Sequence, residues 1–169
     1  IVMAGDVFET STPTPTQLRV AIDAINNLTD IAPVLLITGN HDHPVTTGLE
    51  HALDFLREQD GVWLLDTPKI VMWKSVAVCS LPWPVPAITG DKNALDMYQA
   101  KIKQLKQMAE DKNAPSLAVG HFTAKGSLPS GSERSLEMSR EQVFPPAMFD
   151  GVDYTALGHI HKHQSFEEQ

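Results

Sequence analysis

The stretch Val34-Leu35-Leu36-Ile37-Thr38-Gly39-Asn40-His41-Asp42 joins an apolar run to a polar tip. Four consecutive Val, Leu and Ile residues predict a buried strand, because such runs are typical of strands that are covered on both faces. Gly39 ends the run, and an amide, an imidazole and a carboxylate follow it at once. In α/β sheets, ligands bind at the carboxyl ends of the strands. The stretch therefore predicts an α/β fold with its chemistry at a strand tip.

Three further segments repeat this arrangement, since each places an acidic or histidine side chain directly after a Gly that ends an apolar run. In chain order they are Gly5-Asp6-Val7-Phe8-Glu9, Gly120-His121 and Gly158-His159-Ile160-His161. Carboxylate, amide oxygen and imidazole ligands suit divalent Mn, Fe or Zn. The only cysteine is Cys79, which excludes a site built from paired thiolates. Together the four segments indicate a two-metal site that acts on phosphoesters.

Length and composition set limits on this prediction. A chain of 169 residues with 42% apolar content is expected to form one domain. It contains no apolar run of the roughly 20 residues that a membrane span needs, and one cysteine without a signal-peptide core favours a cytoplasmic location. The net charge of −8 argues against the basic surface expected of a nucleic-acid binder. Two bound divalent cations would offset part of that charge around Asp6.

Secondary structure is predicted to alternate between strands and helices. The segment Thr14-Pro15-Thr16-Gln17 forms a capping box with Pro at the first helical position, and it predicts a helix of about four turns. Further helices are expected from about Thr47 to Glu58 and from about Lys92 to Asp111, whereas Pro and Gly residues predict irregular structure between Trp83 and Gly90. The remaining strands are expected at Val62–Leu65, Ile70–Trp73, Val76–Leu81, Ser116–Val119 and Tyr154–Leu157.

The four metal-type motifs stand in the order found in the calcineurin-like metallophosphoesterases, which the chain resembles over essentially its whole length. Three connecting stretches resemble the SbcD branch of this family, the nuclease subunits of the SbcC–SbcD DNA repair complex: Ser80-Leu81-Pro82-Trp83-Pro84, Ser130-Gly131-Ser132-Glu133-Arg134 and Asp153-Tyr154-Thr155-Ala156-Leu157-Gly158, with Gln164 after the last motif. The resemblance implies a four-layer αββα sandwich, in which two packed sheets carry helices on both outer sides and the ligand loops meet at one edge.

The resemblance also implies which residues bind metal. Asp6 would bridge two divalent ions, most typically Mn, with Mg, Fe or Zn as alternatives. Asn40, His121 and His159 would complete the shell of one ion, and His161 would join Asp6 on the other. Family members carry an additional Asp-x-His motif for that second ion, and no such motif occurs in this sequence. Residues 1–169 are therefore expected to be a metallophosphoesterase domain that is truncated at its N-terminus and lacks a C-terminal capping domain.

Two residues are expected to act beyond metal binding. The resemblance implies that His41 faces the phosphate and protonates the leaving oxygen, while Asp42 orients the His41 ring. Each assignment has a structural alternative, since Asp6 after a strand can cap a turn and Gly39-Asn40 can form a tight turn. The histidines at positions 43, 51 and 163 match no ligand position of the family and are interpreted as ordinary core or surface residues.

The expected function is that of a Mn-dependent DNA exonuclease and endonuclease that acts on duplex ends and hairpins. The resemblance implies a homodimer that works with an SbcC-type coiled-coil ATPase. Two alternatives stay open at this point. One is another phosphodiesterase of the same fold, acting on a small nucleotide or a phospholipid precursor. The other is a non-catalytic fragment that keeps the fold and binds a partner.

Overall fold

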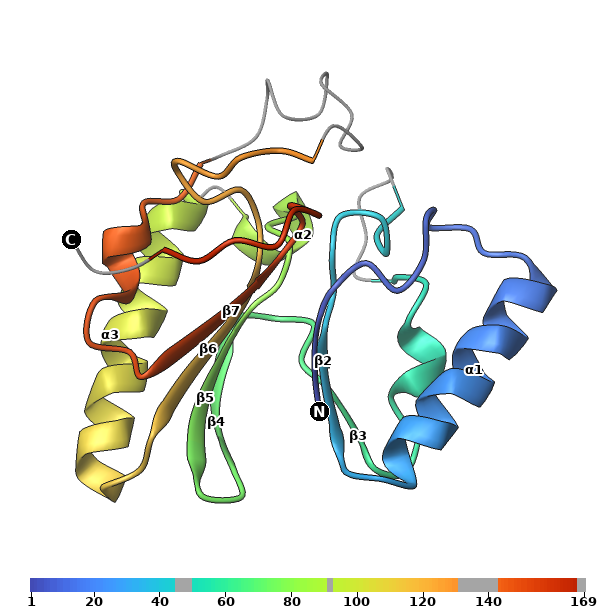
Figure 1. The fold of residues 1–169 in the computed structure, drawn as a ribbon, viewed down its shortest axis with the longest axis horizontal. Coiled ribbons are helices and arrows are strands. Elements are labelled where there is room, and N and C mark those ends of the chain that lie inside the picture. The colour runs from blue at the N-terminus through green and yellow to red at the C-terminus, as the bar shows by residue number, and fades with distance from the viewer. Residues whose placement is uncertain (45–49, 91–92, 131–142, 167–169) are drawn as a thin grey trace.

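Two β-sheets with helices on their outer sides make up the computed structural model, which describes residues 1–44, 50–90, 93–130 and 143–166 (Figure 1). No helix in these four ranges is long and apolar enough to cross a membrane. The two sheets contain three and four strands, and the chain completes the first before it enters the second. The first three strands in the sequence therefore form one sheet, and the last four form the other.

The first sheet is parallel throughout and has the strand order β1 (Val2–Ala4), β2 (Val34–Ile37), β3 (Val62–Leu64). Its outer face is covered by helix α1 (Pro15–Thr29), where Ala21 and Ile25 pack in one apolar cluster with Leu36. The predicted capping box is present, because the Thr14 side chain accepts from the Gln17 N–H while the Gln17 side chain accepts from the Thr14 N–H. The predictions for α1 and β2 are thereby confirmed.

The second sheet has the strand order β4 (Lys69–Trp73), β5 (Val76–Leu81), β6 (Ser116–His121), β7 (Tyr154–Gly158). Strand β4 is antiparallel to β5, and the other pairings are parallel. Helix α3 (Ala94–Lys112) covers the outer face with Tyr98, Ile102 and Leu105, which pack in one cluster with Cys79 of β5. A short 3-10 helix, η2 (Pro146–Phe149), adds Met148 to the same cluster.

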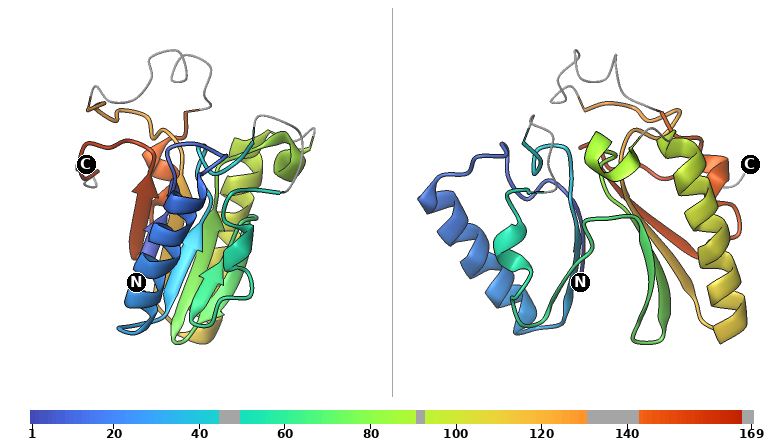
Figure 2. Two further views of the ribbon diagram at one scale, coloured as in Figure 1. Left: turned by 90° about the vertical axis from the view of Figure 1, so that its right-hand side faces the viewer. Right: turned by 180° about the vertical axis from the view of Figure 1, so that it is seen from behind.

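The inner faces of the two sheets pack against each other. Leu35 and Ile37 of β2 contact the apolar cluster that includes Val78 of β5 and Val119 of β6, whereas Leu36 points to the helix side. This division follows from strand geometry, because successive side chains point to opposite faces of a sheet. Figure 2 shows the resulting four layers of helix, sheet, sheet and helix. The predicted αββα sandwich is confirmed.

The parallel strands of both sheets end at the same edge of the molecule, at the top of Figure 1. All four metal-type motifs therefore arrive at one place. Strand β6 runs through Gly120 to His121, two residues beyond its predicted end at Val119, because His121 still pairs with Gly158 of β7.

The helix predicted from Thr47 to Glu58 is wrong for the described part of that range, since residues 45–49 lie outside the description. Residues 50–58 contain only the 3-10 helix η1 (Asp54–Leu56). The backbone N–H groups find other acceptors here: Ala52 donates to the carbonyl of Asp42 and Leu53 to Nδ1 of His51. Side-chain and long-range acceptors thus replace the helical hydrogen bonds.

A second correction concerns the segment between Trp83 and Gly90, which is not wholly irregular. It contains the one-turn helix α2 (Pro86–Thr89), which has Pro86 in its first turn. Proline suits that position, because its missing N–H would have no partner within the helix.

Candidate metal centre

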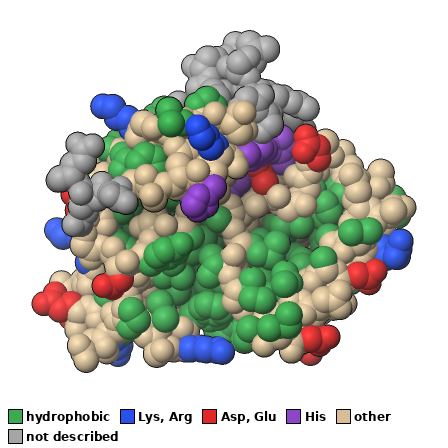
Figure 3. All heavy atoms as spheres, viewed as in Figure 1, with side chains coloured by type: hydrophobic (Ala, Val, Ile, Leu, Met, Phe, Trp, Pro, Cys, Tyr) green, Lys and Arg blue, Asp and Glu red, His purple; other side chains and the backbone are tan. Residues whose placement is uncertain are grey.

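Four of the predicted metal ligands converge where the strands end. Asp6 follows β1, Asn40 follows β2, His121 is the last residue of β6 and His159 follows β7 directly. The Nε2 atom of His121 lies 3.1 Å from Oδ2 of Asp6 and 3.0 Å from Oδ1 of Asn40. That Asn40 oxygen lies 2.9 Å from Nδ1 of His159. In Figure 3, histidine side chains gather beside a carboxylate at this edge.

Asp6, His121 and His159 each offer a ligand atom within 4.8 Å of the others, and they form the one such group found among the described residues. The backbone is unusual at two of them, because Asp6 and His159 have φ angles of 53° and 88°. Non-glycine residues rarely adopt this left-handed conformation, and it concentrates at functional sites. The fold thus holds these ligands in a costly conformation.

The glycine before each ligand allows the loops to approach closely. A Cβ atom on Gly39 would lie 2.5 Å from the backbone nitrogen of Asp6, and one on Gly5 would lie 2.8 Å from the nitrogen of Gly39. Neither distance is possible without moving backbone. The Gly-ligand pattern at these two positions therefore reflects the close approach of the loops that follow β1 and β2.

The orientation of His121 shows that the site fits a cation. Its Nδ1 lies 2.6 Å from the carbonyl oxygen of Ala4, which only accepts, so Nδ1 carries a proton. In the neutral ring, the lone pair of Nε2 then faces the oxygens of Asp6 and Asn40, which are also electron-pair donors. Oxygen and imidazole donors that face one another in this way suit a divalent metal, and the backbone contact to Nδ1 resembles the outer-shell support of metal-bound histidines.

The charge state of Asp6 also suits a metal ligand. Burial by itself raises the pKa of Asp6, but in the metal-free chain the neighbouring His121 lowers it, as does the backbone N–H of His41 at 3.0 Å. The net result is a pKa below the ordinary value. Asp6 is therefore ionised at neutral pH, as a carboxylate must be to bind metal.

Asp42 does not have the role predicted for it. Its buried carboxylate accepts three backbone N–H groups, from Gly39 at 2.8 Å, Asp6 at 3.0 Å and Val7 at 3.2 Å. The Nδ1 atom of His41 lies instead 2.8 Å from the carbonyl oxygen of Glu9. The prediction that Asp42 orients the His41 ring is wrong, because both Asp42 oxygens hold the loop that carries Asp6. Burial raises the pKa of Asp42, as does the nearby charge of Asp6, although the Gly39 N–H opposes the rise.

His161 is exposed and does not belong to the cluster of Asp6, His121 and His159. Its expected place on a second metal ion stays a prediction. Trp83, in contrast, enters the site without having been assigned a role from sequence. Its ring centroid lies 5.2 Å from that of His159 and 6.2 Å from that of His121. The signal in the sequence was an aromatic residue between two prolines at the end of a strand.

The histidines expected to be ordinary residues include two that are buried beside the site. His43 donates to or accepts from the Thr38 hydroxyl through Nε2, at 3.0 Å, and its ring packs edge-on against His51. His51 contacts Asp66, which also pairs with Arg57. Burial alone raises the pKa of Asp66, but these two partners bring it well below its usual range.

We expect His43 to make folding less stable in mild acid. Burial, aided by the neighbouring His51, lowers the pKa of His43 to about 4, although Asp66 and Asp54 oppose the shift. An unfolded histidine takes up its proton near pH 6.5, so the unfolded chain binds more protons below that pH. Between pH 7 and pH 5 this effect removes at most about 2 kcal/mol of stability.

Urea unfolding of the metal-free chain at both pH values measures this loss. His43→Leu serves as the comparison, because it has no proton to take up and its stability should fall less between pH 7 and pH 5. Equal losses in both proteins would show that His43 does not titrate as its burial requires.

Two packed sheets with carboxylate, amide and imidazole groups at the strand ends are the arrangement of the calcineurin-like phosphoesterases. Proteins of this class use divalent metals. The calcineurin-like phosphoesterase family matches residues 1–163, and the chain belongs to that family.

Individual relatives narrow the comparison. The chain is 27% identical over 197 residues to the D subunit of nuclease SbcCD from Escherichia coli (strain K12), an alignment that covers 97% of this chain and 46% of that protein. It is 28% identical over 180 residues to the D subunit of nuclease SbcCD from Staphylococcus saprophyticus, covering 99% of this chain and 47% of that protein. The resemblance to the SbcD branch is confirmed, and the chain spans about half the length of these relatives.

Proposed function

We propose that residues 1–169 form the metallophosphoesterase domain of an SbcD-type nuclease, which hydrolyses phosphodiester bonds in DNA with two divalent ions, preferably Mn. The convergence of Asp6, Asn40, His121 and His159 at one edge of the sandwich carries this proposal. Similarity to SbcCD nucleases over nearly the whole chain supports the choice of DNA as substrate.

In this proposal Asp6, Asn40, His121 and His159 hold metal, and His161 is a ligand of the second ion. When bound, the divalent metal stabilises the charge of the phosphate and acidifies the attacking water. The carbonyl of Ala4 keeps the His121 ring turned toward Asp6 and Asn40. Asp42 fixes the backbone of the Asp6 loop against that of Gly39. The chain therefore contributes a rigid ligand frame.

His41 is the proposed proton donor to the leaving oxygen. Because the Glu9 carbonyl only accepts hydrogen bonds, Nδ1 of His41 carries a proton in that contact. Nε2 is then the atom that exchanges a proton with the substrate. A ring held by backbone keeps its direction while its charge changes, which suits general acid catalysis.

The proposal extends to partners. The relatives are subunits of SbcCD, so we infer that a coiled-coil ATPase of SbcC type and a second copy of this chain assemble with it. Duplex ends and hairpins are the proposed DNA forms. Bound divalent cations would reduce the repulsion between phosphate and a chain of net charge −8. The cytoplasmic location predicted from the single cysteine stays a prediction.

A nuclease assay tests the proposal. We expect Mn-dependent shortening of linear duplex DNA, faster than hydrolysis of a cyclic nucleotide at equal phosphodiester concentration. Asp6→Asn should lower the rate about a hundredfold, because a neutral amide would hold a divalent cation less well than a carboxylate. Preference for the cyclic nucleotide would instead support another phosphodiesterase of this fold. Equal rates for wild type and Asp6→Asn would contradict the assigned site.

A further inference from the structure

Trp83 is the aromatic residue that touches the metal ligands of the second sheet. Its ring lies against the His159 ring with an interplanar angle of 39° and meets the His121 ring nearly edge-on, at 76°. The two histidine rings also meet each other, 5.3 Å apart. Trp83 belongs to none of the three apolar clusters formed by the described residues. Among the described residues, its ring contacts are with the two histidines.

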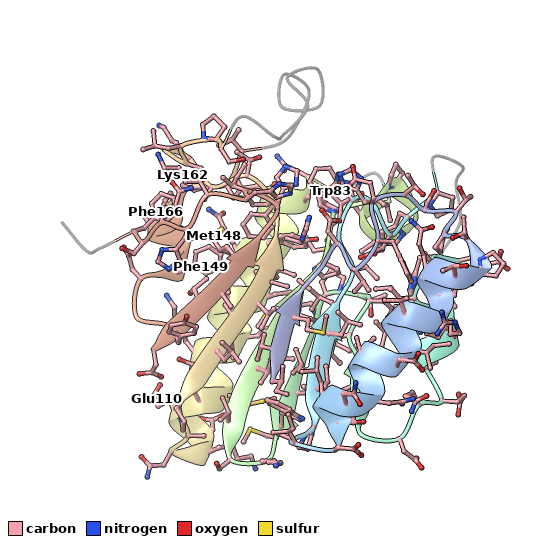
Figure 4. The ribbon with its side chains drawn as sticks, turned by 45° about the vertical axis from the view of Figure 1, so that its right-hand side comes forward. Trp83, Glu110, Met148, Phe149, Lys162 and Phe166 are labelled. Carbon is pink, nitrogen blue, oxygen red and sulfur yellow. The ribbon has the colours of Figure 1, made fainter. Side chains whose placement is uncertain are left out.

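The backbone around Trp83 is fixed to both halves of the molecule. The Trp83 N–H donates to the carbonyl of Thr38 at 3.0 Å, just before the Gly39-Asn40 tip of β2 in the first sheet. The carbonyl of the preceding Pro82 accepts from the hydroxyl of Tyr98, which is buried on α3 behind the second sheet. Figure 4 places Trp83 at the ends of the strands, where the two sheets meet.

These anchors fix the backbone from which the Trp83 ring extends. Pro82 and Pro84 flank it and restrict the backbone torsions. The Trp83 carbonyl also accepts from the N–H of Val85 at 2.9 Å. A large flat ring held in this way limits the rotation of the imidazoles packed on it, and edge-on and tilted ring contacts favour defined geometries. His159, one of the two imidazoles packed on Trp83, has a left-handed backbone.

We propose that Trp83 is a positioning residue of the metal centre, which holds the His121 and His159 rings in their metal-binding orientation and ties them to the Asn40 loop through Thr38. This inference rests on the proposed metal site. If Trp83 acts in this way, its effect depends on a large aromatic ring. Phenylalanine should therefore replace tryptophan well, and leucine should replace it badly.

Titration with Co²⁺ alone tests the proposal, because its visible absorption bands report the geometry of the ligands. In Trp83→Leu we expect the affinity for Co²⁺ to fall about tenfold, the size of effect known for outer-shell partners, and the bands to shift. Trp83→Phe should bind within about twofold of wild type with unchanged bands. The half-exposed Trp63 of β3 supplies a matched control, and Trp63→Leu should resemble wild type.

Fluorescence gives a second reading that does not depend on a destabilised variant. The chain has three tryptophans, and Co²⁺ quenches emission from rings close to it. Trp83→Phe should lose most of the quenching seen in wild type, whereas Trp63→Phe should keep it.

The outcomes separate the two proposals. If wild type binds no Co²⁺, the metal site itself fails and the inference fails with it. If wild type binds but Trp83→Leu shows the same affinity and the same bands, the metal site stands and the role of Trp83 is refuted. Unchanged quenching in Trp83→Phe refutes it equally.

Discussion

We expect Gly158→Ala to lower the free energy of unfolding by about 3 kcal/mol and to abolish metal binding, because it inserts a methyl group where the two sheets nearly touch. A Cβ on Gly158 would overlap the carbonyl oxygen of Ala4 and lie 2.8 Å from Nδ1 of His121. Since the first of these is backbone, it cannot rotate away. The end of β7 must move from the end of β1, and the hydrogen bond that orients His121 is lost.

Gly151→Ala is the matched control for this change. Gly151 has a φ of 75°, and a Cβ atom placed on it would meet no neighbouring atom within 4 Å, so alanine there meets backbone strain without a clash. We expect a loss of about 1 kcal/mol and normal metal affinity. Urea unfolding and Mn titration of both variants measure these effects. If Gly158→Ala is no less stable than Gly151→Ala, the close approach of β1 and β7 is not real.

Asp42→Ala should be similarly damaging, with a loss of about 3–5 kcal/mol, because it leaves three backbone N–H groups without their acceptor. Asp42→Asn should lose about 1–2 kcal/mol. Its single oxygen can take the place of Oδ2, which serves Gly39 and Asp6, while its amide group cannot accept from Val7. The expected order of stability is therefore wild type, then Asn, then Ala, measured by chemical unfolding of the metal-free chain.

The same series distinguishes two roles for Asp42. A carboxylate that only orients the His41 ring would lower turnover and leave stability unchanged. A carboxylate that holds the loops together changes stability first, and metal affinity falls because Asp6 moves. Three proteins of equal stability would contradict the role that the hydrogen bonds assign to Asp42.

Local patterns in the sequence predicted much of the fold. The capping box at Thr14 and the apolar run at Val34 each depend on neighbours in the chain, and both structures formed as expected. The helix predicted from Thr47 failed, because the acceptor for the Ala52 N–H lies ten residues earlier, on Asp42. A hydrogen-bond acceptor in another part of the chain leaves no trace in the local pattern of apolar residues from which the helix was predicted.

In the candidate site, too, local motifs were predictable from the sequence and contacts between distant residues were not. Gly before each ligand marked Asp6, Asn40, His121 and His159, and the structure brings these four together. The groups that orient these ligands could not be predicted from the sequence. The carbonyl of Ala4 contacts the ring of His121, 117 residues away, and any residue type can supply a carbonyl. Asp42 was found by its motif, but its partners on Asp6 and Val7 could be seen only once the two loops were placed side by side.

Calorimetric titration of the metal-free chain with Mn²⁺ tests most directly whether these ligands form a metal centre. We expect saturable binding in wild type, unchanged in a variant of the exposed His163, and at least about tenfold weaker in His159→Ala. Absence of binding in wild type, or equal affinity in His159→Ala, would contradict the assignment of Asp6, Asn40, His121 and His159 as metal ligands.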